Sequence, residues 1–188
     1  MDAYDAIARR VSTRAFQDRS VPRETIERLL GAAVRAPNHK LTEPWRFAVV
    51  TGASRDRLAE LRRVHRAARF PDPAAPDAAK SIERTWRETR ETPAFVVVLC
   101  AQSDDAVRRE EDVASAWMAV QNLLTAATAE GLGTYVRTGG ILTDPGVEAL
   151  IRLPAGFRVI ALVSLGYPSV DEAPRRRTPA AQKTLWLD

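Results

Sequence analysis

The 188-residue sequence predicts a single α/β or α+β domain in which helices sandwich a modest sheet. Two patterns predict this class: helical stretches outnumber the strand-like runs, and helices separate the strands along the chain. Hydrophobic residues make up 45% of the sequence, which is enough for one sizeable core at this length. No repeat or long linker divides residues 1–188, so we expect one domain.

Two helices are predicted before the first strand. Asp2 is placed to cap the first helix, because an aspartate side chain accepts a hydrogen bond from a free backbone N–H there. The inner face of this helix is expected to carry four apolar residues: Tyr4, Ile7, Ala8 and Val11. Pro22 begins the second helix and Pro37 ends it, since proline fits the first turn of a helix and interrupts later ones.

A strand over residues 45–51 comes next, followed by arginine-rich helices over residues 54–70 and 77–91. The proline-rich residues 71–76 form a short rigid loop between them. The arginines of these helices alternate with acids, a pattern typical of a solvated, ion-paired helix face: Arg55, Arg57 and Arg62 lie around Asp56 and Glu60, and Arg84 and Arg87 around Glu83 and Glu88.

Residues 94–101 are a continuous apolar run, which is typical of a central strand buried on both faces. The longest helix is predicted over residues 107–130, and Gly131 ends it in the position of a C′ glycine. One side of that helix is expected to face the core: Val113, Ala114, Trp117, Val120, Gln121, Leu124 and Ala127.

The last third of the chain is predicted to hold two strands, a short helix and a tail. Asp144 is placed to cap the helix, between strands over residues 132–137 and 157–165. The tail, residues 169–188, is too polar to fold alone but ends in Leu185-Trp-Leu187. This apolar end needs burial, and a second subunit is a suitable host.

Composition excludes several classes of protein. The formal charge of +4 permits nucleic-acid binding, but we find no groove-binding motif, zinc-ligand set or aromatic RNA platform, so neither nucleic acid nor a metal is expected. No apolar run approaches the ~20 residues that span a bilayer, and residues 1–5 lack the pattern of a secretory signal. The single cysteine, Cys100, has no intrachain partner, which favours a reducing cytoplasm.

Residues 9–16, Arg-Arg-Val-Ser-Thr-Arg-Ala-Phe, are the strongest functional signal in the sequence. Three arginines and two hydroxyls lie around a predicted turn at the end of the first helix. Guanidinium groups bind phosphate oxygens in pairs, and hydroxyls and free backbone N–H groups add short neutral contacts. Together with residues 35–47 and 131–139, this segment suggests a bound flavin nucleotide.

Four motifs occur in the order in which the FMN-dependent nitroreductase family carries them. Arg10-Val-Ser-Thr-Arg-Ala-Phe16 resembles its amino-terminal Arg-Arg-Ser-x-Arg-x-Phe motif, and residues 36–47 resemble its Ala-Pro-Ser-x-x-Asn-x-Gln-Pro-Trp-x-Phe segment. Residues 131–135 and 165–168 are similar to its Gly-Leu-Gly-Ser/Thr segment and its Gly-Tyr-Pro turn. The resemblance covers nearly the whole chain and is closest to the compact, single-domain NAD(P)H nitroreductases.

This resemblance implies an α+β fold, an α-β-α sandwich with a mixed, largely antiparallel central sheet. It also implies a domain-swapped homodimer that exchanges residues 169–188, with tightly bound FMN in sites built from both subunits. NADH or NADPH would reduce the flavin, and a nitroaromatic, quinone or other flat acceptor would reoxidise it at the same site. No protein side chain is implied as a catalytic residue, because the flavin carries the chemistry.

Residues carried over from the family form two groups. Arg10 and Ser12 match phosphate and ribityl contacts, Arg14 matches a cation near the flavin pyrimidine, and Val11 can offer only backbone groups. The ten positions that match flavin contacts are Arg10, Val11, Ser12, Arg14, Arg35, His39, Val136, Arg137, Thr138 and Arg177. The positions that approach the nicotinamide are Ala126, Ala127, Thr128, Ala129, Glu130 and Gly131.

Several of these residues also fit a role without a ligand. An arginine cluster suits the negative end of a helix dipole, and Thr138 and Arg177 could equally be solvated. Leu41 stands where larger family members have asparagine, and it cannot hydrogen-bond the flavin edge. Either His39 or Lys40 replaces that contact, or recognition of the pyrimidine is weaker here.

The predicted function is ping-pong hydride transfer from NAD(P)H through FMN to a flat acceptor. No Gly-x-Gly-x-x-Gly fingerprint is present, which agrees with NAD(P)H as a transient substrate. Three alternatives remain. The chain could be a flavoenzyme of the same fold with another reaction, such as reductive dehalogenation or flavin fragmentation. It could also be a non-catalytic flavin-binding protein, or an arginine-rich nucleic-acid binder.

Overall fold

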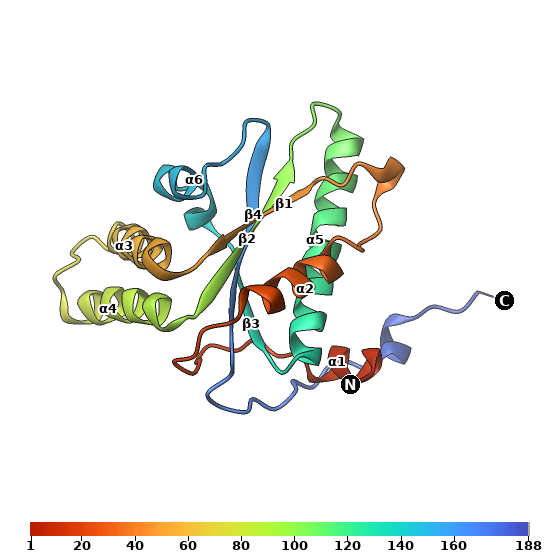
Figure 1. Ribbon diagram of the computed structural model, residues 1–188, viewed down its shortest axis with the longest axis horizontal. Helices are drawn as coiled ribbons and strands as arrows, with labels where there is room; N and C mark the ends of the chain where they lie inside the picture. Colours follow the sequence, from red (N-terminus) through yellow and green to blue (C-terminus); the bar gives the residue numbers. More distant parts are fainter. Residues whose placement is uncertain (188) are drawn as a thin grey trace.

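The computed structural model describes residues 1–187, which form three layers around one sheet (Figure 1). Helices α2 and α5 cover one face of the sheet, α3 and α6 cover the other, and α4 packs against α3. The helices are α1 (Ala3–Arg9), α2 (Arg23–Ala33), α3 (Gly52–Ala67), α4 (Pro76–Glu91), α5 (Ala106–Ala129) and α6 (Pro145–Ile151). The strands are β1 (Trp45–Val50), β2 (Ala94–Ala101), β3 (Gly133–Arg137) and β4 (Phe157–Gly166), and the 3-10 turns are η1 (His39–Leu41), η2 (Gly140–Thr143) and η3 (Ala180–Lys183).

The strands lie in the order β1-β2-β4-β3, and each pair of neighbours is antiparallel. The α+β sandwich is therefore confirmed, although the expected mixed sheet is antiparallel in all four named strands. Its parallel component is an isolated bridge between Ser12 and Thr134, at the outer edge of β3. This bridge brings the amino-terminal segment alongside the sheet.

Strand β2 lies in the middle of the sheet and is buried on both faces, as its unbroken apolar run predicts. Because successive side chains of a strand point to opposite faces, Val96 and Cys100 pack beneath α2 and α5. Phe95 and Val97 pack beneath α3 and α6. The sheet thus carries two separate apolar cores, one under each helical layer.

The ends of several helices follow from single residues. The side chain of Asp2 accepts a hydrogen bond from the backbone N–H of Asp5, and that of Asp144 accepts from Gly146 and Val147, so both predicted caps are confirmed. Gly131 follows α5 with a φ of +75°, a left-handed conformation that glycine adopts without a Cβ penalty. This turn directs the chain from α5 straight into β3.

One predicted helix face is wrong for the single chain and another is confirmed in part. Tyr4 and Ile7 of α1 are 87% and 57% exposed, and the buried residue of that helix is Ala6. On α5 the core face is wider than predicted and shifted to one side. Four predicted residues are buried or pack against the core, namely Val113, Val120, Leu124 and Ala127, whereas Ala114, Trp117 and Gln121 are exposed. Ala116, Ala119 and Leu123 are buried in addition. Apolar spacing alone predicts both faces. Because α5 has apolar residues on nearly every side, that spacing does not single out its core face.

The chain ends in an extended tail that leaves the body of the molecule beyond α1 (Figure 1). Leu185, Trp186 and Leu187 are 81%, 82% and 86% exposed in the single chain. Within residues 1–187, no helix is both long enough and apolar enough to cross a membrane.

Candidate active site

The arginine-rich segment after α1 lies along the edge of the sheet. The backbone N–H of Thr13 donates to the carbonyl of Thr134 at 2.8 Å, and Phe16 forms an antiparallel bridge with Pro168. The backbone N–H of Gln17 donates to the carbonyl of Tyr167 at 2.9 Å. The segment is therefore fixed at both ends, against β3 and against the turn that follows β4.

Gly133 makes this close approach possible. A Cβ added at Gly133 would lie 2.5 Å from Oγ1 of Thr13, far inside van der Waals contact. Thr13 itself is 3% exposed, so it has no room to move aside. The second glycine of the Gly131-Leu-Gly133 motif is thus explained by backbone packing against the arginine-rich segment.

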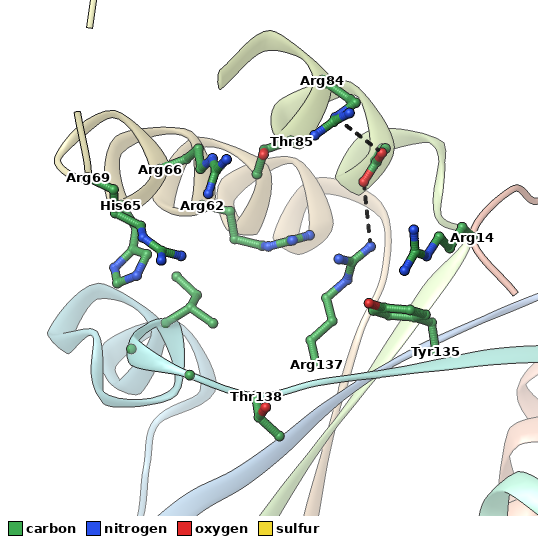
Figure 2. A pocket seen from close by; sticks show the side chains of 14 residues that line it. Arg14, Arg62, His65, Arg66, Arg69, Arg84, Thr85, Tyr135, Arg137 and Thr138 are labelled. Atoms are coloured by element: carbon green, nitrogen blue, oxygen red, sulfur yellow. Dashed lines mark ion pairs between the residues drawn. The ribbon is translucent and has the colours of Figure 1, made fainter. Parts of the chain in front are cut away.

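A cavity of about 420 Å³ opens between the end of β3 and the hairpin of α3 and α4 (Figure 2). Its volume is within the roughly 300–1,000 Å³ typical of small-molecule sites. Six arginines and a histidine line it, together with one carboxylate, Glu88. The lining residues are Arg14, Arg62, His65, Arg66, Arg69, Arg84, Thr85, Glu88, Tyr135, Arg137, Thr138, Gly139, Gly140 and Ile141.

Arg62 is the most buried of these cations. It is 9% exposed, and its Nη1 donates to the hydroxyl of Thr89 at 2.6 Å. Burial lowers the pKa of Arg62 to about 10, and the nearby charge of Arg137 acts in the same direction. The expectation that Arg62 belongs to a solvated, ion-paired face is wrong, because the α3–α4 hairpin covers it.

Arg137 extends from the end of β3 into the same cavity. Its Nη2 lies 3.8 Å from Oε2 of Glu88, and its guanidinium lies 4.6 Å from the ring centre of Tyr135. Arg14 lies over the same ring at 5.3 Å. Burial lowers the pKa of Arg137, while the charge of Glu88 opposes that shift. Two cations from distant parts of the sequence therefore share one aromatic ring at the wall of the cavity (Figure 2).

A sequence model of the Nitroreductase family matches residues 7–167. The chain belongs to the nitroreductase family. YfhC of Bacillus subtilis, which carries the name of an NAD(P)H nitroreductase, is 32% identical over 93% of this chain and 89% of its own length. The family is one of oxidoreductases, and most of this chain lies within the matched region.

Solved structures of the family share the fold. A nitroreductase-like protein from Bacillus cereus superposes with a TM-score of 0.84 at 28% identity, covering 100% of this chain and 97% of its own. A Desulfovibrio desulfuricans protein classed as a nitroreductase, in complex with FMN, superposes with a TM-score of 0.75 at 25% identity, covering 100% of this chain and 98% of its own.

Two other relatives are named for different reactions. A 5,6-dimethylbenzimidazole synthase of Rhodospirillum rubrum is 30% identical over 89% of this chain and 82% of its own length. An iodotyrosine dehalogenase homolog of Caenorhabditis elegans is 29% identical over 89% of this chain and 55% of its own length.

In this nitroreductase, the structure brings together most of the residues predicted to contact flavin. Arg14, Arg137 and Thr138 line the cavity, and Val136 precedes them on β3. Arg10, Val11 and Ser12 belong to the segment that lies beside β3, with Ser12 exposed and bridged to Thr134. Seven of the ten predicted positions therefore lie on two adjoining stretches of backbone.

Arg35 and His39 line neither of the two cavities described for the flavin contacts. Arg35 follows the end of α2, where the carbonyl of Ala32 accepts a hydrogen bond from Nδ2 of Asn122 at 3.3 Å. Nδ1 of His39 is 3.8 Å from Oε1 of Glu111, near the amino end of α5. Val11 shares a second cavity, of about 440 Å³, with Thr128 near the other end of that helix. Glu111 and Thr128 are separated by about 25 Å of helix axis at 1.5 Å per residue. The single chain thus does not bring all the predicted flavin contacts to one place.

The loop that follows His39 has an unusual backbone. Lys40, Leu41 and Glu43 have φ angles of 51°, 53° and 43°, in the left-handed region that non-glycine residues rarely adopt. Oδ1 of Asn38 accepts a hydrogen bond from the N–H of Glu43 at 2.9 Å, which helps to hold the loop. As a result Leu41, which replaces the asparagine of larger members, is 81% exposed.

The residues predicted to approach the nicotinamide have mixed environments. Ala127 is fully buried in the core, so its side chain offers no surface to a ligand, contrary to expectation. Glu130 is held in an ion pair with Arg28 at 2.6 Å. Thr128 and Gly131 line the second cavity. Ala126 packs partly against the core, and Ala129 is exposed at the last turn of α5.

Arg177 lies in the exposed tail and is not among the residues that line either cavity. Its Nη1 donates to the neighbouring carbonyl of Arg176 at 3.3 Å. No cluster of three or more His, Cys, Asp or Glu side chains suited to a metal occurs among residues 1–187.

Sequence reasoning missed the arginines that α3 and α4 contribute to the cavity. A signal was available: Arg62, Arg66 and Arg69 recur at i, i+4 and i+7, and residues 61–71 contain no acid. Such spacing places the three cations on one helix face without a carboxylate in that face. An unneutralised stripe of this kind indicates a ligand more strongly than a general excess of arginine does.

Proposed function

We propose that the chain is an FMN-dependent oxidoreductase that takes hydride from NAD(P)H and passes electrons to a nitroaromatic, quinone or similar flat acceptor. The observation that supports this most is that Arg14, Arg137 and Thr138 line one cavity, while the Arg10–Arg14 segment lies alongside β3. The relatives named as NAD(P)H nitroreductases and the family structure in complex with FMN support it independently.

The residues at the cavity fit a flavin mononucleotide in their chemistry. FMN carries a phosphate dianion and, when reduced, a negative ring, and it supplies hydride acceptance and electron delivery when bound. Outside the cavity, Ser12 is exposed beside β3 and has a hydroxyl that can donate to phosphate, and Arg10, two residues earlier, carries a guanidinium that can do the same. Arg14 and Arg137 place two cations at one ring-sized cavity. A cavity without positive charge would not fit the phosphate dianion or the negative ring of reduced FMN.

Each wall residue then has a physical task. Arg14 and Arg137 create a positive field that favours the reduced, anionic state of the ring. Backbone groups of Val136 and Thr138 lie at the end of β3, where they can orient a planar ligand. Acceptor and NAD(P)H would use the same space in turn, which gives ping-pong kinetics.

We also propose that the protein works as a homodimer that exchanges residues 169–188, with each flavin site shared between two copies. His39 contacts Glu111, about 25 Å of helix axis from Thr128, which shares a cavity with Val11, so a second copy would have to supply His39 to the same flavin. Trp117 and Met118 of α5 and the apolar end of the tail are exposed in the single chain. The lone buried thiol of Cys100 fits a reducing compartment such as the cytoplasm.

The proposal is tested on the purified full-length protein by its visible spectrum and by anaerobic titration. We expect a flavin spectrum that bleaches on addition of NADH or NADPH and returns on addition of a nitroaromatic. Protein that is colourless, and stays so after incubation with FMN, would contradict flavin binding. Flavin that NAD(P)H fails to bleach would indicate a non-catalytic binding protein instead.

Two relatives favour a second candidate, a different reaction on the same flavin. The names 5,6-dimethylbenzimidazole synthase and iodotyrosine dehalogenase homolog correspond to flavin fragmentation and reductive dehalogenation. Product analysis after aerobic incubation of the reduced protein separates these reactions. Loss of intact FMN indicates fragmentation, and release of iodide from an iodinated phenol indicates dehalogenation.

A further inference from the structure

The cavity has two walls, and the proposed flavin contacts use one of them. The wall formed by β3 and the amino-terminal segment contributes Arg14, Tyr135, Arg137 and Thr138. The opposite wall comes from α3, the turn that follows it and α4, and we call it the helical wall: it consists of Arg62, His65, Arg66, Arg69 and Arg84. Figure 2 shows these side chains on the side of the cavity formed by the α3–α4 hairpin.

The cations of the helical wall are held mainly by neutral groups. Nε and Nη2 of Arg66 donate to the hydroxyl of Ser81 at 3.0 and 2.7 Å, and its guanidinium lies 5.0 Å from the ring centre of Phe70. Arg62 donates to the hydroxyl of Thr89. Among the ion pairs of residues 1–187, none includes Arg62, Arg66 or Arg69.

The acids that reach this region are already shared. Glu88 lies 3.9 Å from Arg84 and 3.8 Å from Arg137, so it serves both walls at once. Asp144 lies 3.8 Å from Nδ1 of His65. These two carboxylates therefore leave most of the positive charge of the cavity without a counter-ion.

Hydroxyl and ring contacts orient a guanidinium but do not neutralise its charge. Side chains arranged in this way keep free N–H donors, since a guanidinium has five and Arg62 uses one within the protein. No buried side-chain nitrogen or oxygen in the described part of the chain lacks a hydrogen-bond partner, so the remaining donors of Arg62 reach the solvent of the cavity. An oxyanion in the cavity would satisfy both the donors and the charge.

We propose that the helical wall is an oxyanion subsite that binds a phosphate or carboxylate group of a substrate. Arg62 and Arg66 lie one turn apart on α3, and Arg69 lies in the turn that follows the helix, where its backbone N–H donates to the carbonyl of Arg66 at 3.2 Å. The end of α3 thus presents three guanidiniums to one cavity. The oxyanion would be either the 2′-phosphate of NADPH or a carboxylate on the electron acceptor. This inference rests on the proposed function, because it assigns the β3 wall to the flavin.

The first test measures binding of inorganic phosphate to the full-length protein, as purified, by titration calorimetry and by thermal shift against chloride of equal ionic strength. The variant Arg66→Ala/Arg69→Ala should bind phosphate at least tenfold more weakly than the wild type. The control Arg57→Ala/Arg63→Ala removes the same charge from exposed positions of the same helix and should bind phosphate as the wild type does. Equal weakening in both variants would reduce the effect to net charge and overturn the subsite.

The second test separates the two sources of the oxyanion through KM. Two substrate pairs differ by one group: NADPH against NADH, and 4-nitrobenzoate against nitrobenzene. In Arg66→Ala/Arg69→Ala, KM should rise at least tenfold for the oxyanion-bearing member of one pair and stay unchanged for its partner. A variant that shows no such selectivity in either pair overturns the proposal.

The flavin content of the same variant tests whether the helical wall binds the flavin phosphate rather than a substrate. Arg66→Ala/Arg69→Ala should retain the flavin content of the wild type. If it loses flavin, the helical wall holds the flavin phosphate and the subsite for substrate is overturned. A wild type that never binds flavin would refute the proposed function instead, while the phosphate titration would still report on the helical wall.

Discussion

The helices on the two sides of the sheet differ in how they accommodate a buried charged side chain. The layer of α2 and α5 buries the thiol of Cys100 and one carboxylate, Asp112, which is 3% exposed. That carboxylate is already paired: it accepts a hydrogen bond from the hydroxyl of Thr42 at 2.7 Å and lies 3.6 Å from Nε of Arg108. The layer of α3 and α4 buries a charge, Arg62, beside a cavity of about 420 Å³. The buried carboxylate of Asp112 is satisfied without a ligand, whereas Arg62 belongs to no ion pair in the described part of the chain and is stabilised when an anion enters the cavity.

The difference does not come from the sheet. Strand β2 presents Val96 and Val98 to one layer and Phe95 and Val97 to the other, so both layers pack on apolar surfaces of similar kind. It comes from the helices that lie above. The comparison therefore predicts that changes in the α2/α5 layer affect assembly and stability, and that changes in the α3/α4 layer affect the response to anions.

The largest expected effect is on assembly, through the apolar end of the tail. Replacing Leu185, Trp186 and Leu187 by serine should raise the dissociation constant of the dimer by about a thousandfold, or ~4 kcal/mol, because each large side chain contributes roughly 1.5–3 kcal/mol when buried. Sedimentation velocity measures this constant over a dilution series. Serine at residues 180–182 keeps the tail length and should leave the constant unchanged, and identical profiles for both variants would contradict the exchange of the tail.

The next effect concerns the buried thiol of the α2/α5 layer. Burial, together with the charge of Asp112, raises the pKa of Cys100 from 9.0 to about 11. In the unfolded chain the thiol ionises near pH 9 while the folded chain keeps it neutral, so the stabilisation is complete below pH 9 and is lost as the pH rises to 11. Over that window the loss is about 2.7 kcal/mol at 1.36 kcal/mol per pH unit.

Urea denaturation at several pH values measures this linkage, with Cys100→Ala as the matched variant. The variant loses a buried side chain at every pH, so it should be less stable than the wild type at pH 8. The difference between the two should then shrink as the pH approaches 11, since only the wild type has the titrating thiol. Parallel stability curves from pH 8 to pH 11 would mean that the thiol is not protected as its burial suggests.

Much of the fold could be predicted because the decisive signals are local. Asp144 caps α6 by accepting hydrogen bonds from nearby backbone N–H groups, and Gly131 ends α5 through its left-handed φ. Residues 94–101 are apolar throughout, as expected for a strand that is buried on both faces of the sheet. The inner face of α1 could not be found in this way. Its apolar residues Tyr4 and Ile7 are exposed in the single chain, so their spacing carried no information about the core of that chain.

The candidate site could be predicted only in part, for the same physical reason. The Arg10–Arg14 segment and residues 136–138 are contiguous motifs, and the structure places them side by side. Arg62 was predicted to be solvated because Glu60 and Asp56 lie near it in sequence, yet its hydrogen-bond partner is Thr89, on another helix. Contacts between α3 and α4 depend on how the hairpin packs, which spacing along one helix does not report.

The smallest of the three effects tests the α3/α4 layer directly. Arg62→Met keeps a long apolar stem and removes the buried charge, so in buffer without phosphate we expect the free energy of unfolding to rise by about 2 kcal/mol. Burial lowers the pKa of Arg62 to about 10, which shows that the folded protein disfavours its charged form. The hydroxyl of Thr89 loses one partner but still donates to the carbonyl of Thr85 at 2.7 Å, so it keeps a hydrogen bond in the variant. Urea denaturation measures the change.

The neighbouring residue provides the control for this variant. Arg63 is exposed and pairs with Glu60 at 2.8 Å, so Arg63→Met should lower stability by at most about 0.5 kcal/mol. Phosphate should remove the advantage of Arg62→Met, because it stabilises the wild type through the cation that the variant lacks. An Arg62→Met protein that is less stable than the wild type, with or without phosphate, would show that the bond to Thr89 outweighs the cost of burying the charge. The two layers would then differ in composition but not in their need for a ligand.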